Sequence, residues 1–256
     1  MRRYILLFIL LLTYGFMAYS QESRTLSVVT TKDEVDLTDI TLITIPTQGP
    51  FMLSGNEVHS LIENNKTSTI FFPKEMYIED MVWTGADFAI KSRHEIYMLN
   101  DVETPVFVFE EEEFKIFPWN EQKVFIVYHG EGKDIVYYGN LKHKKTKRLI
   151  TFDEEVVYVT ALGEATMIVT SKNVYLFTEE ECIKYINFWT PVNTAVMTSK
   201  GLFFATQGEI CLLTGIDTFI LLFDSGCKQL LYDYKDLYIL TNGSDLVKCD
   251  IEMLDL

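Results

Sequence analysis

The fold is decided by a stretch such as residues 167–175, Met-Ile-Val-Thr-Ser-Lys-Asn-Val-Tyr, in which two short apolar strands are joined by a polar turn. The second strand opens on an acidic or amide residue followed by Val, Ile or Leu. This opening occurs six times, at Glu57, Glu95, Asp134, Asn173, Glu209 and Asp245, with intervals of 38, 39, 39, 36 and 36 residues. A period of roughly 20 to 50 residues is typical of proteins built from one repeated supersecondary unit.

Each unit contains two further strands. A Phe-rich outer strand follows five of the copies, at 69–72, 106–109, 149–152, 183–188 and 219–223. An innermost strand precedes each hairpin and begins near Ile40, Ile78, Phe114, Val157, Val192 and Leu230. The sequence therefore predicts six units of four antiparallel strands.

The two ends of the chain complement each other. Only eleven residues follow Asp245, which is enough for a third strand but not for a fourth. The sequence of residues 25–31 predicts a strand that belongs to no unit, and we expect this N-terminal strand to complete the last unit and close a ring. The predicted fold is an all-β, six-bladed β-propeller of four-stranded antiparallel blades, forming a single domain over residues 21–256.

The pattern resembles the six-bladed β-propeller superfamily, which includes the NHL-repeat and lactonase-like proteins, over nearly all of residues 24–256. It has neither the Trp-Asp ending of WD40 repeats nor the paired glycines of kelch repeats. The resemblance therefore implies an architecture and no specific subfamily. The alternative fold is a two-sheet sandwich, but its Greek-key connections would not produce so regular a period.

The first 20 residues have the features of a secretory signal peptide. Arg2 and Arg3 precede an apolar run at 4–18, and Ala18 and Ser20 occupy the −3 and −1 positions of a cleavage site before Gln21. We expect cleavage between Ser20 and Gln21 and a secreted or periplasmic protein. The alternative is an uncleaved signal anchor, although the run is shorter than the ~20 residues that a bilayer span needs. No later apolar stretch is long enough for a membrane span.

Composition and charge exclude several classes of protein. Hydrophobic residues make up 48% of the chain, which is too many for intrinsic disorder. The 37 acidic residues outnumber the 22 basic ones, so the net charge of −15 argues against a nucleic-acid partner. The four cysteines, Cys182, Cys211, Cys227 and Cys249, have no zinc-ligand spacing, and they are either buried thiols or partners in a disulfide whose pairing the sequence does not choose.

Candidate site residues gather on one face of the predicted ring. The turns between second and third strands and the links between blades all emerge on this face, which we call the link face. Arg93, His94 and Glu95 lie in the turn of the second blade, and His129 and Asp134 in that of the third. A histidine near carboxylates can act as a general base or bind a sugar or carboxylate ligand. The alternative is that these are ordinary exposed turn residues.

Three further features concern surfaces. Trp189, in a blade link, is either a stacking platform or partner contact, or a cap over the gap between blades four and five.

Two acidic runs lie at 110–113 and 153–155, and they would either attract a cation or a basic partner or be solvated loops. No calcium-loop spacing is present, so we predict no metal site. The basic run at 142–148 is expected in a turn on the opposite face, and Trp83 and Trp119 are expected in the core near that face.

Catalytic motifs are missing from the sequence. It has no GxSxG, HExxH, P-loop or dinucleotide fingerprint, although propeller enzymes assemble their sites from scattered loop residues. We therefore expect a monomeric, exported, noncatalytic propeller without a cofactor, acting as an interaction platform or ligand-binding protein for a protein or carbohydrate partner. The alternative is a hydrolase or lyase acting on a carbohydrate or lactone, with His94 and His129 at the mouth of the ring.

Overall fold

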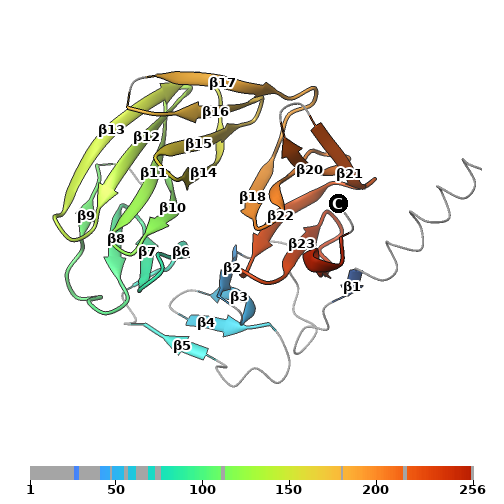
Figure 1. The fold of residues 1–256 in the computed structure, drawn as a ribbon. Coiled ribbons are helices and arrows are strands. Elements are labelled where there is room, and N and C mark those ends of the chain that lie inside the picture. The colour runs from blue at the N-terminus through green and yellow to red at the C-terminus, as the bar shows by residue number, and fades with distance from the viewer. Residues whose placement is uncertain are drawn as a thin grey trace, which may run out of the picture.

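The chain folds into a ring of six four-stranded antiparallel sheets, as the ribbon in Figure 1 shows. The computed structural model describes residues 26–28, 41–46, 48–54, 57–61, 69–72, 76–110, 113–179, 181–215 and 218–254. Each sheet corresponds to one repeat, so the six-bladed β-propeller is confirmed. The predicted signal peptide and its cleavage site between Ser20 and Gln21 lie outside the described residues.

The strands follow one another from the innermost to the outermost position of each blade. Blade 1 contains β2 (Thr41–Ile45), β3 (Gly49–Ser54), β4 (Glu57–Ser60) and β5 (Thr69–Phe71), and blade 2 contains β6 (Asp80–Trp83), β7 (Phe88–Ser92), β8 (Glu95–Met98) and β9 (Phe107–Val108). Blade 3 contains β10 (Phe114–Asn120), β11 (Lys123–Gly130), β12 (Lys133–Asn140) and β13 (Lys145–Phe152), and blade 4 contains β14 (Val156–Leu162), β15 (Ala165–Thr170), β16 (Asn173–Phe177) and β17 (Cys182–Asn187). Blade 5 contains β18 (Thr194–Thr198), β19 (Gly201–Ala205), β20 (Ile210–Gly215) and β21 (Thr218–Phe223).

The sixth blade closes the ring with strands from both ends of the chain. Its inner strands are β22 (Cys227–Tyr232), β23 (Leu237–Thr241) and β24 (Leu246–Cys249), and its outermost strand is β1 (Leu26–Val28). β1 pairs antiparallel with β24, so that Leu26 lies opposite Cys249 and Val28 opposite Val247. The predicted closure by an N-terminal strand is confirmed. A short 3-10 helix (Ile251–Met253) follows β24.

The core is divided among the junctions between blades. Side chains alternate across a strand, so each blade buries residues on both of its faces. In β11, Val124 and Ile126 pack against blade 2, whereas Phe125 and Val127 pack against blade 4. Each of the six buried hydrophobic clusters lies between two neighbouring blades. The large aromatic content of the sequence is therefore used mainly to fill these junctions.

Threonine hydroxyls close the turns that precede the repeated opening in blades 4, 5 and 6. Thr170 Oγ1 accepts the backbone N–H of Asn173 at 2.9 Å, and Thr206 Oγ1 accepts that of Glu209 at 3.1 Å. In blade 6, Thr241 Oγ1 accepts the N–H of Asp245 at 3.0 Å. A hydroxyl can replace a backbone carbonyl as the acceptor in a tight turn. The same type of hydrogen bond therefore precedes the third strand in these three repeats.

One prediction about the outer edge is only partly right, because residues 142–144 lie in the turn but the rest of the basic run does not. The basic run at 142–148 was expected in the turn before the outer strand of blade 3, but β13 begins at Lys145, which lies opposite Asn140. Residues 145–148 therefore belong to the outermost strand and are exposed. Charged side chains on an edge strand oppose pairing with another sheet.

No helix among the described residues is both long enough and apolar enough to cross a membrane.

Candidate functional site

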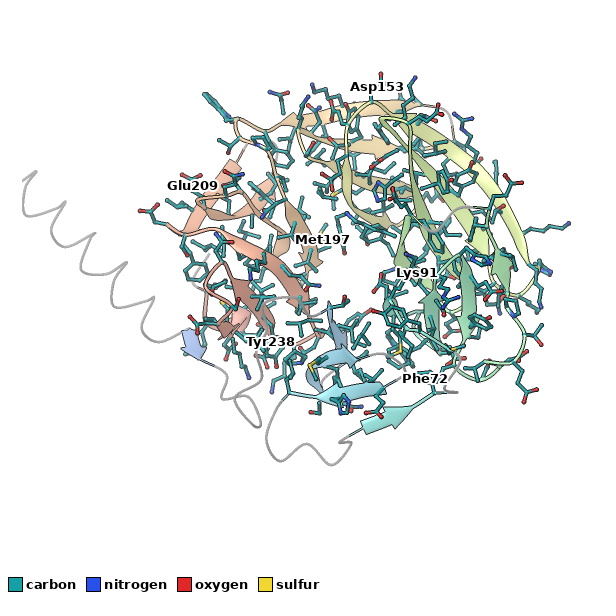
Figure 2. The ribbon with its side chains drawn as sticks, turned by 180° about the vertical axis from the view of Figure 1, so that it is seen from behind. Phe72, Lys91, Asp153, Met197, Glu209 and Tyr238 are labelled. Carbon is teal, nitrogen blue, oxygen red and sulfur yellow. The ribbon has the colours of Figure 1, made fainter. Side chains whose placement is uncertain are left out.

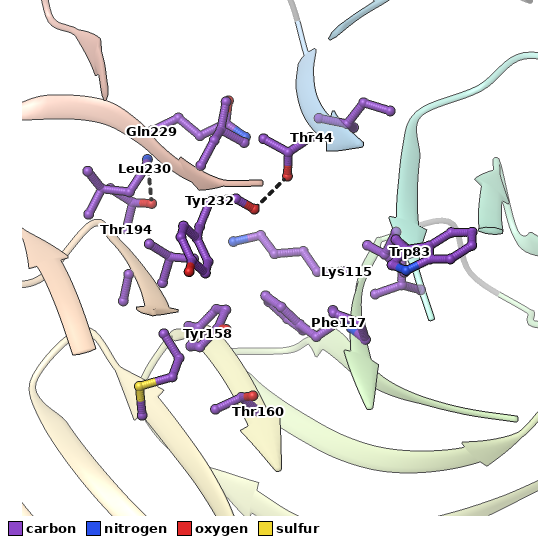
Figure 3. A pocket seen from close by; sticks show the side chains of 18 of the residues that line it. Thr44, Trp83, Lys115, Phe117, Tyr158, Thr160, Thr194, Gln229, Leu230 and Tyr232 are labelled. Atoms are coloured by element: carbon purple, nitrogen blue, oxygen red, sulfur yellow. Dashed lines mark hydrogen bonds between the residues drawn. The ribbon is translucent and has the colours of Figure 1, made fainter. Parts of the chain in front are cut away.

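The six innermost strands surround a central channel, seen from close by in Figure 3. The cavity has a volume of about 720 Å³. Because every blade has four antiparallel strands and the chain enters each from the link face, all the innermost strands run in the same direction. Their first residues therefore lie toward the link face and their last residues toward the opposite face. Figure 2 shows Met197 of β18 beside the opening, with Asp153 and Glu209 near the rim.

Aromatic side chains from four blades line the channel: Trp83, Phe117, Trp119, Tyr158 and Tyr232. Phe117 and Tyr158 pack edge to face with 5.7 Å between their ring centroids. Trp119 is stacked on Phe125, with centroids 4.8 Å apart and ring planes 5° apart, so this stacked face of the indole is already covered. Rings such as Trp83 and Tyr232 provide the apolar surface on which a flat ligand or a sugar ring can pack.

Polar side chains at the channel wall also join neighbouring blades. Thr44 Oγ1 donates to the carbonyl of Tyr232 at 2.9 Å, and Gln229 Nε2 donates to the carbonyl of Leu42 at 3.0 Å, which ties blade 1 to blade 6. Figure 3 draws the first of these bonds. A hydroxyl that donates one bond still has acceptor lone pairs, and a side-chain amide has both donors and an acceptor. The wall therefore offers hydrogen-bonding groups whose positions are fixed by the closed ring.

Three charged groups line the channel among the described residues, all near the link face. Asp80 is the first residue of β6, and its Oδ1 accepts the backbone N–H of Met81 at 2.8 Å. Burial raises the pKa of Asp80 to about 6, despite the opposing effects of the Met81 N–H, Lys91 and Lys115. Lys115 and Lys228 are each the second residue of an innermost strand, and Figure 3 shows the Lys115 side chain extending into the opening.

A second, smaller pocket of about 300 Å³ lies on the link face of blade 3. His129 Nδ1 and Asp134 Oδ1 are 2.8 Å apart there, and Asp134 Oδ2 accepts the backbone N–H of Val156 at 2.6 Å. His129 Nε2 is buried and has no hydrogen-bond partner among the described residues. The remaining side chains around this pocket are mostly acidic: Glu113, Glu131, Lys133, Glu154 and Glu155.

The structure brings together only part of the predicted set. His129 and Asp134 are in contact, but Arg93, His94 and Glu95 line neither of these two pockets. Arg93 is exposed in the turn of blade 2 with a φ of 53°. Glu95 accepts a hydrogen bond from the Tyr97 hydroxyl at 2.5 Å. Burial and this carboxylate raise the pKa of Tyr97 to about 12.

The tryptophans differ sharply in exposure. Trp189 lies between β17 and β18 and is 94% exposed, so of its two alternatives the cap over the gap between blades 4 and 5 is excluded. Trp83 and Trp119 pack on the core as expected, but both also line the channel. Sequence reasoning missed the channel, although the aromatic residues within the innermost strands were a signal for it.

Most of the cysteines are buried in the protein, and Glu154 of the acidic runs forms hydrogen bonds within it. Cys211, Cys227 and Cys249 are buried thiols and Cys182 is exposed. Of the acidic runs, residues 111 and 112 lie outside the described residues. Glu154 accepts hydrogen bonds from Asn173 Nδ2 at 2.7 and 2.8 Å. The part of the chain that the structure describes contains no group of three or more His, Cys, Asp or Glu residues arranged to hold a metal ion.

The fold is similar to those of several solved propellers at low sequence identity. No protein-family model and no curated protein sequence matches the chain. A regucalcin from Agrobacterium tumefaciens, described as a calcium-binding protein, is 10% identical with a TM-score of 0.61, covering 86% of this chain and 92% of its own. A chain of a nidogen/laminin complex is 11% identical with a TM-score of 0.59, over 79% and 89% of the two chains. A luciferin-regenerating enzyme is 10% identical with a TM-score of 0.57, over 87% and 92%.

Proposed function

We propose that the protein is an exported, noncatalytic propeller that binds a carbohydrate in its central channel. One observation carries the proposal: a cavity of about 720 Å³ is lined by aromatic rings together with hydroxyl and amide groups held in place by the closed ring. Ligand sites in proteins typically have volumes of roughly 300 to 1,000 Å³ and combine apolar walls with a few fixed polar groups. Sugar rings need both, because their C–H faces pack on aromatic rings while their hydroxyls form hydrogen bonds.

The lining favours binding over catalysis. Asp80 is the one carboxylic acid among the described lining residues, and none of them is a histidine. Glycoside cleavage canonically uses a pair of carboxylic acids within reach of the same bond. The channel wall offers one such acid, so we assign it a binding role.

The structural neighbours do not discriminate between the candidate functions. They include a calcium-binding protein, a chain from a protein complex and an enzyme, and one fold commonly supports many functions. The exported location rests on the sequence of residues 1–20, whose charged start and apolar run are typical of a secretory signal. Fractionation of the native host, with the protein detected in the envelope or the medium, tests the location.

Tryptophan fluorescence tests binding in the channel. The chain has three tryptophans, and Trp189→Phe leaves Trp83 and Trp119 as reporters, both of which line the channel. We expect titration with disaccharides, such as cellobiose, chitobiose and digalacturonate, to change the emission of this variant at saturating ligand. Adding Trp83→Leu should weaken binding at least tenfold, whereas Tyr77→Ala, at a residue 56% exposed outside the channel, should not. Equal affinities in these two variants would place any binding elsewhere.

A second candidate function is favoured by the pair on blade 3. A histidine whose Nδ1 contacts a carboxylate and whose Nε2 is unpartnered among the described residues has the arrangement of an oriented general base. This supports a hydrolase or lyase acting on a carbohydrate or lactone in the link-face pocket. Assays with chromogenic glycosides and lactones should then show turnover that His129→Gln abolishes and His94→Gln leaves intact. Turnover that is absent from the parent protein rejects this candidate.

A further inference from the structure

We infer that the channel selects an acidic sugar, with the ligand carboxylate bound by Lys115 near the link face and its ring packed on the aromatic side chains deeper in the channel. This inference rests on the proposed carbohydrate-binding function and adds the chemical class of the ligand. It follows from the distribution of charged and aromatic residues along the innermost strands.

The channel has two chemically different ends. Because the innermost strands all run away from the link face, the position of a residue in its strand gives its depth. Lys115 is the second residue of β10 and Trp119 the sixth, while Lys228 and Tyr232 are the second and sixth residues of β22. Four residues of a strand span about 13 Å, at roughly 3.3 Å per residue. The lysines therefore lie at one mouth and Trp119 and Tyr232 toward the other, with Trp83 and Phe117, the fourth residues of their strands, between them.

The charge of the lining is opposite to that of the chain. The whole chain has a net charge of −15, yet the charged residues among the described lining are two lysines and one aspartate. Half-burial raises the pKa of Asp80 to about 6, so this carboxyl is mostly ionised at neutral pH and the three side chains together carry one net positive charge. Lys228 donates a hydrogen bond to Ser244 Oγ at 2.8 Å. The two lysines lie in blades 3 and 6, so an anionic ligand in the channel would meet positive charge from both sides.

Lys115 is the group best placed to bind a carboxylate. Its amine is 3.4 Å from Glu155 Oε1, and both side chains are substantially exposed, at 46% and 59%. Such a pair is weak and its geometry is loose, so a ligand carboxylate can compete for the amine. An ammonium group retains further donors when it contacts one carboxylate oxygen, and Lys115 can contact the ligand without leaving Glu155 completely.

The test compares an acid with its own neutral ester. Digalacturonate and its dimethyl ester have the same rings and hydroxyls but differ in charge, and both are titrated into the Trp189→Phe protein at low salt. We expect the acid to bind at least tenfold more tightly, with the preference decreasing as salt is added. Lys115→Met should reduce the preference to less than threefold, and Lys115→Arg should retain it. Lys147→Met, in the exposed outer strand β13, is the matched control and should leave it unchanged.

The outcomes separate this inference from the proposed function. Equal affinities for acid and ester, reduced in both cases by Trp83→Leu, would overturn the acidic-sugar inference and support carbohydrate binding in the channel. A preference for the acid that survives in Lys115→Met would overturn the role of Lys115. Binding of neither compound would overturn the acidic-sugar inference, while binding of cellobiose or chitobiose to the same protein would still support a carbohydrate site in the channel. Because Lys115 is nearly half exposed, its variants should fold, and matched circular dichroism melts with the parent check this.

Discussion

Lys115 Nζ lies 3.4 Å from Glu155 Oε1, and this contact connects the two pockets of the link face. Lys115 lines the central channel, whereas Glu155 lines the acidic pocket around His129 and Asp134. The two residues come from β10 and from the link between blades 3 and 4. Removing the charge of Glu155 in the acidic pocket therefore changes the electrostatic surroundings of Lys115 in the channel.

Replacing Glu155 should affect ligand binding more than stability. In Glu155→Gln the lysine loses a competing carboxylate, so we expect digalacturonate to bind a few-fold more tightly. The pair is exposed, so the free energy of unfolding should change by less than about 0.5 kcal/mol. Glu209→Gln, at an exposed turn of blade 5, should change neither quantity. Fluorescence titration and urea denaturation measure the two effects, and an unchanged affinity in Glu155→Gln contradicts the competition.

Asp80 should make stability depend on pH. Burial raises its pKa from 3.8 to about 6, so between these values the native state binds more protons than the unfolded state. Stability contributed by this group is therefore greatest below pH ~4 and is lost as the pH rises through ~6. Asp80→Asn removes the titration and should stabilise the protein by about 1 to 2 kcal/mol at pH 7.5, with little effect at pH 4.

Urea denaturation at the two pH values measures this difference. Asp153→Asn is the surface control, because its side chain is 84% exposed, and it should shift both midpoints equally. An Asp80→Asn protein that is less stable than the parent at pH 7.5 would show that the charged form of Asp80 is favoured in the folded state.

Asp134 should contribute to stability whether or not the pocket on blade 3 has a function. Its Oδ2 accepts the buried N–H of Val156, so Asp134→Ala leaves that donor without a partner. The cost of a buried unsatisfied donor is about 1 to 3 kcal/mol. Asp134→Asn keeps an acceptor oxygen and should lose less, and Asp153→Ala should be within about 0.5 kcal/mol of the parent. Equal free energies of unfolding for Asp134→Ala and Asp153→Ala, measured by chemical denaturation, would contradict this role.

The strand β1 should stabilise the closed ring. A chain that begins at residue 31 lacks this strand and leaves β24 at an open edge. We expect a loss of at least about 2 kcal/mol, or roughly 4 to 8 °C in Tm. A chain that begins at residue 26 keeps the strand and is the control. Thermal melts of the two truncations should differ, and identical melts would mean that the pairing of Leu26 with Cys249 does not support the ring.

The cysteines should differ in their reactivity. Burial raises the pKa of the Cys211 thiol to about 11 and those of Cys227 and Cys249 to about 12, whereas Cys182 is exposed on the outer strand β17. A thiol reagent at pH 8 should modify one group in the native protein and four after unfolding. Cys182→Ser should abolish the native reaction. Rapid modification of more than one thiol in the native protein would contradict this burial.

The architecture could be predicted because each repeat uses similar residues to form the turn before its third strand. The opening at Asn173, Glu209 and Asp245 follows a threonine that closes the turn, so a regular period appears in the sequence itself. The boundary of β13 could not be predicted in the same way. Its exposed basic residues have the composition of a turn, and only the pairing with β12 makes them a strand.

The candidate site was only partly predictable. The contact between His129 and Asp134 is local, because the two residues are opposite each other across one hairpin. The channel instead combines residues such as Trp83, Tyr158 and Tyr232 from distant repeats. Aromatic residues also fill the junctions between blades, so residue type alone does not distinguish a channel residue from a core residue. The channel residues can be recognised only when their positions along the six innermost strands are compared.

The pairing of β1 with β24 also sets the order in which the site can form. Leu26 and Cys249 come from opposite ends of the described chain, so this contact has one of the largest sequence separations in the fold. Contacts of this kind form slowly, because the entropy of closing a long loop is lost before the contact is gained. The channel mouth uses β2 and β22 from the two blades that meet at this closure. A nascent chain would therefore have no complete channel during its synthesis, and ligand binding would report that folding is finished.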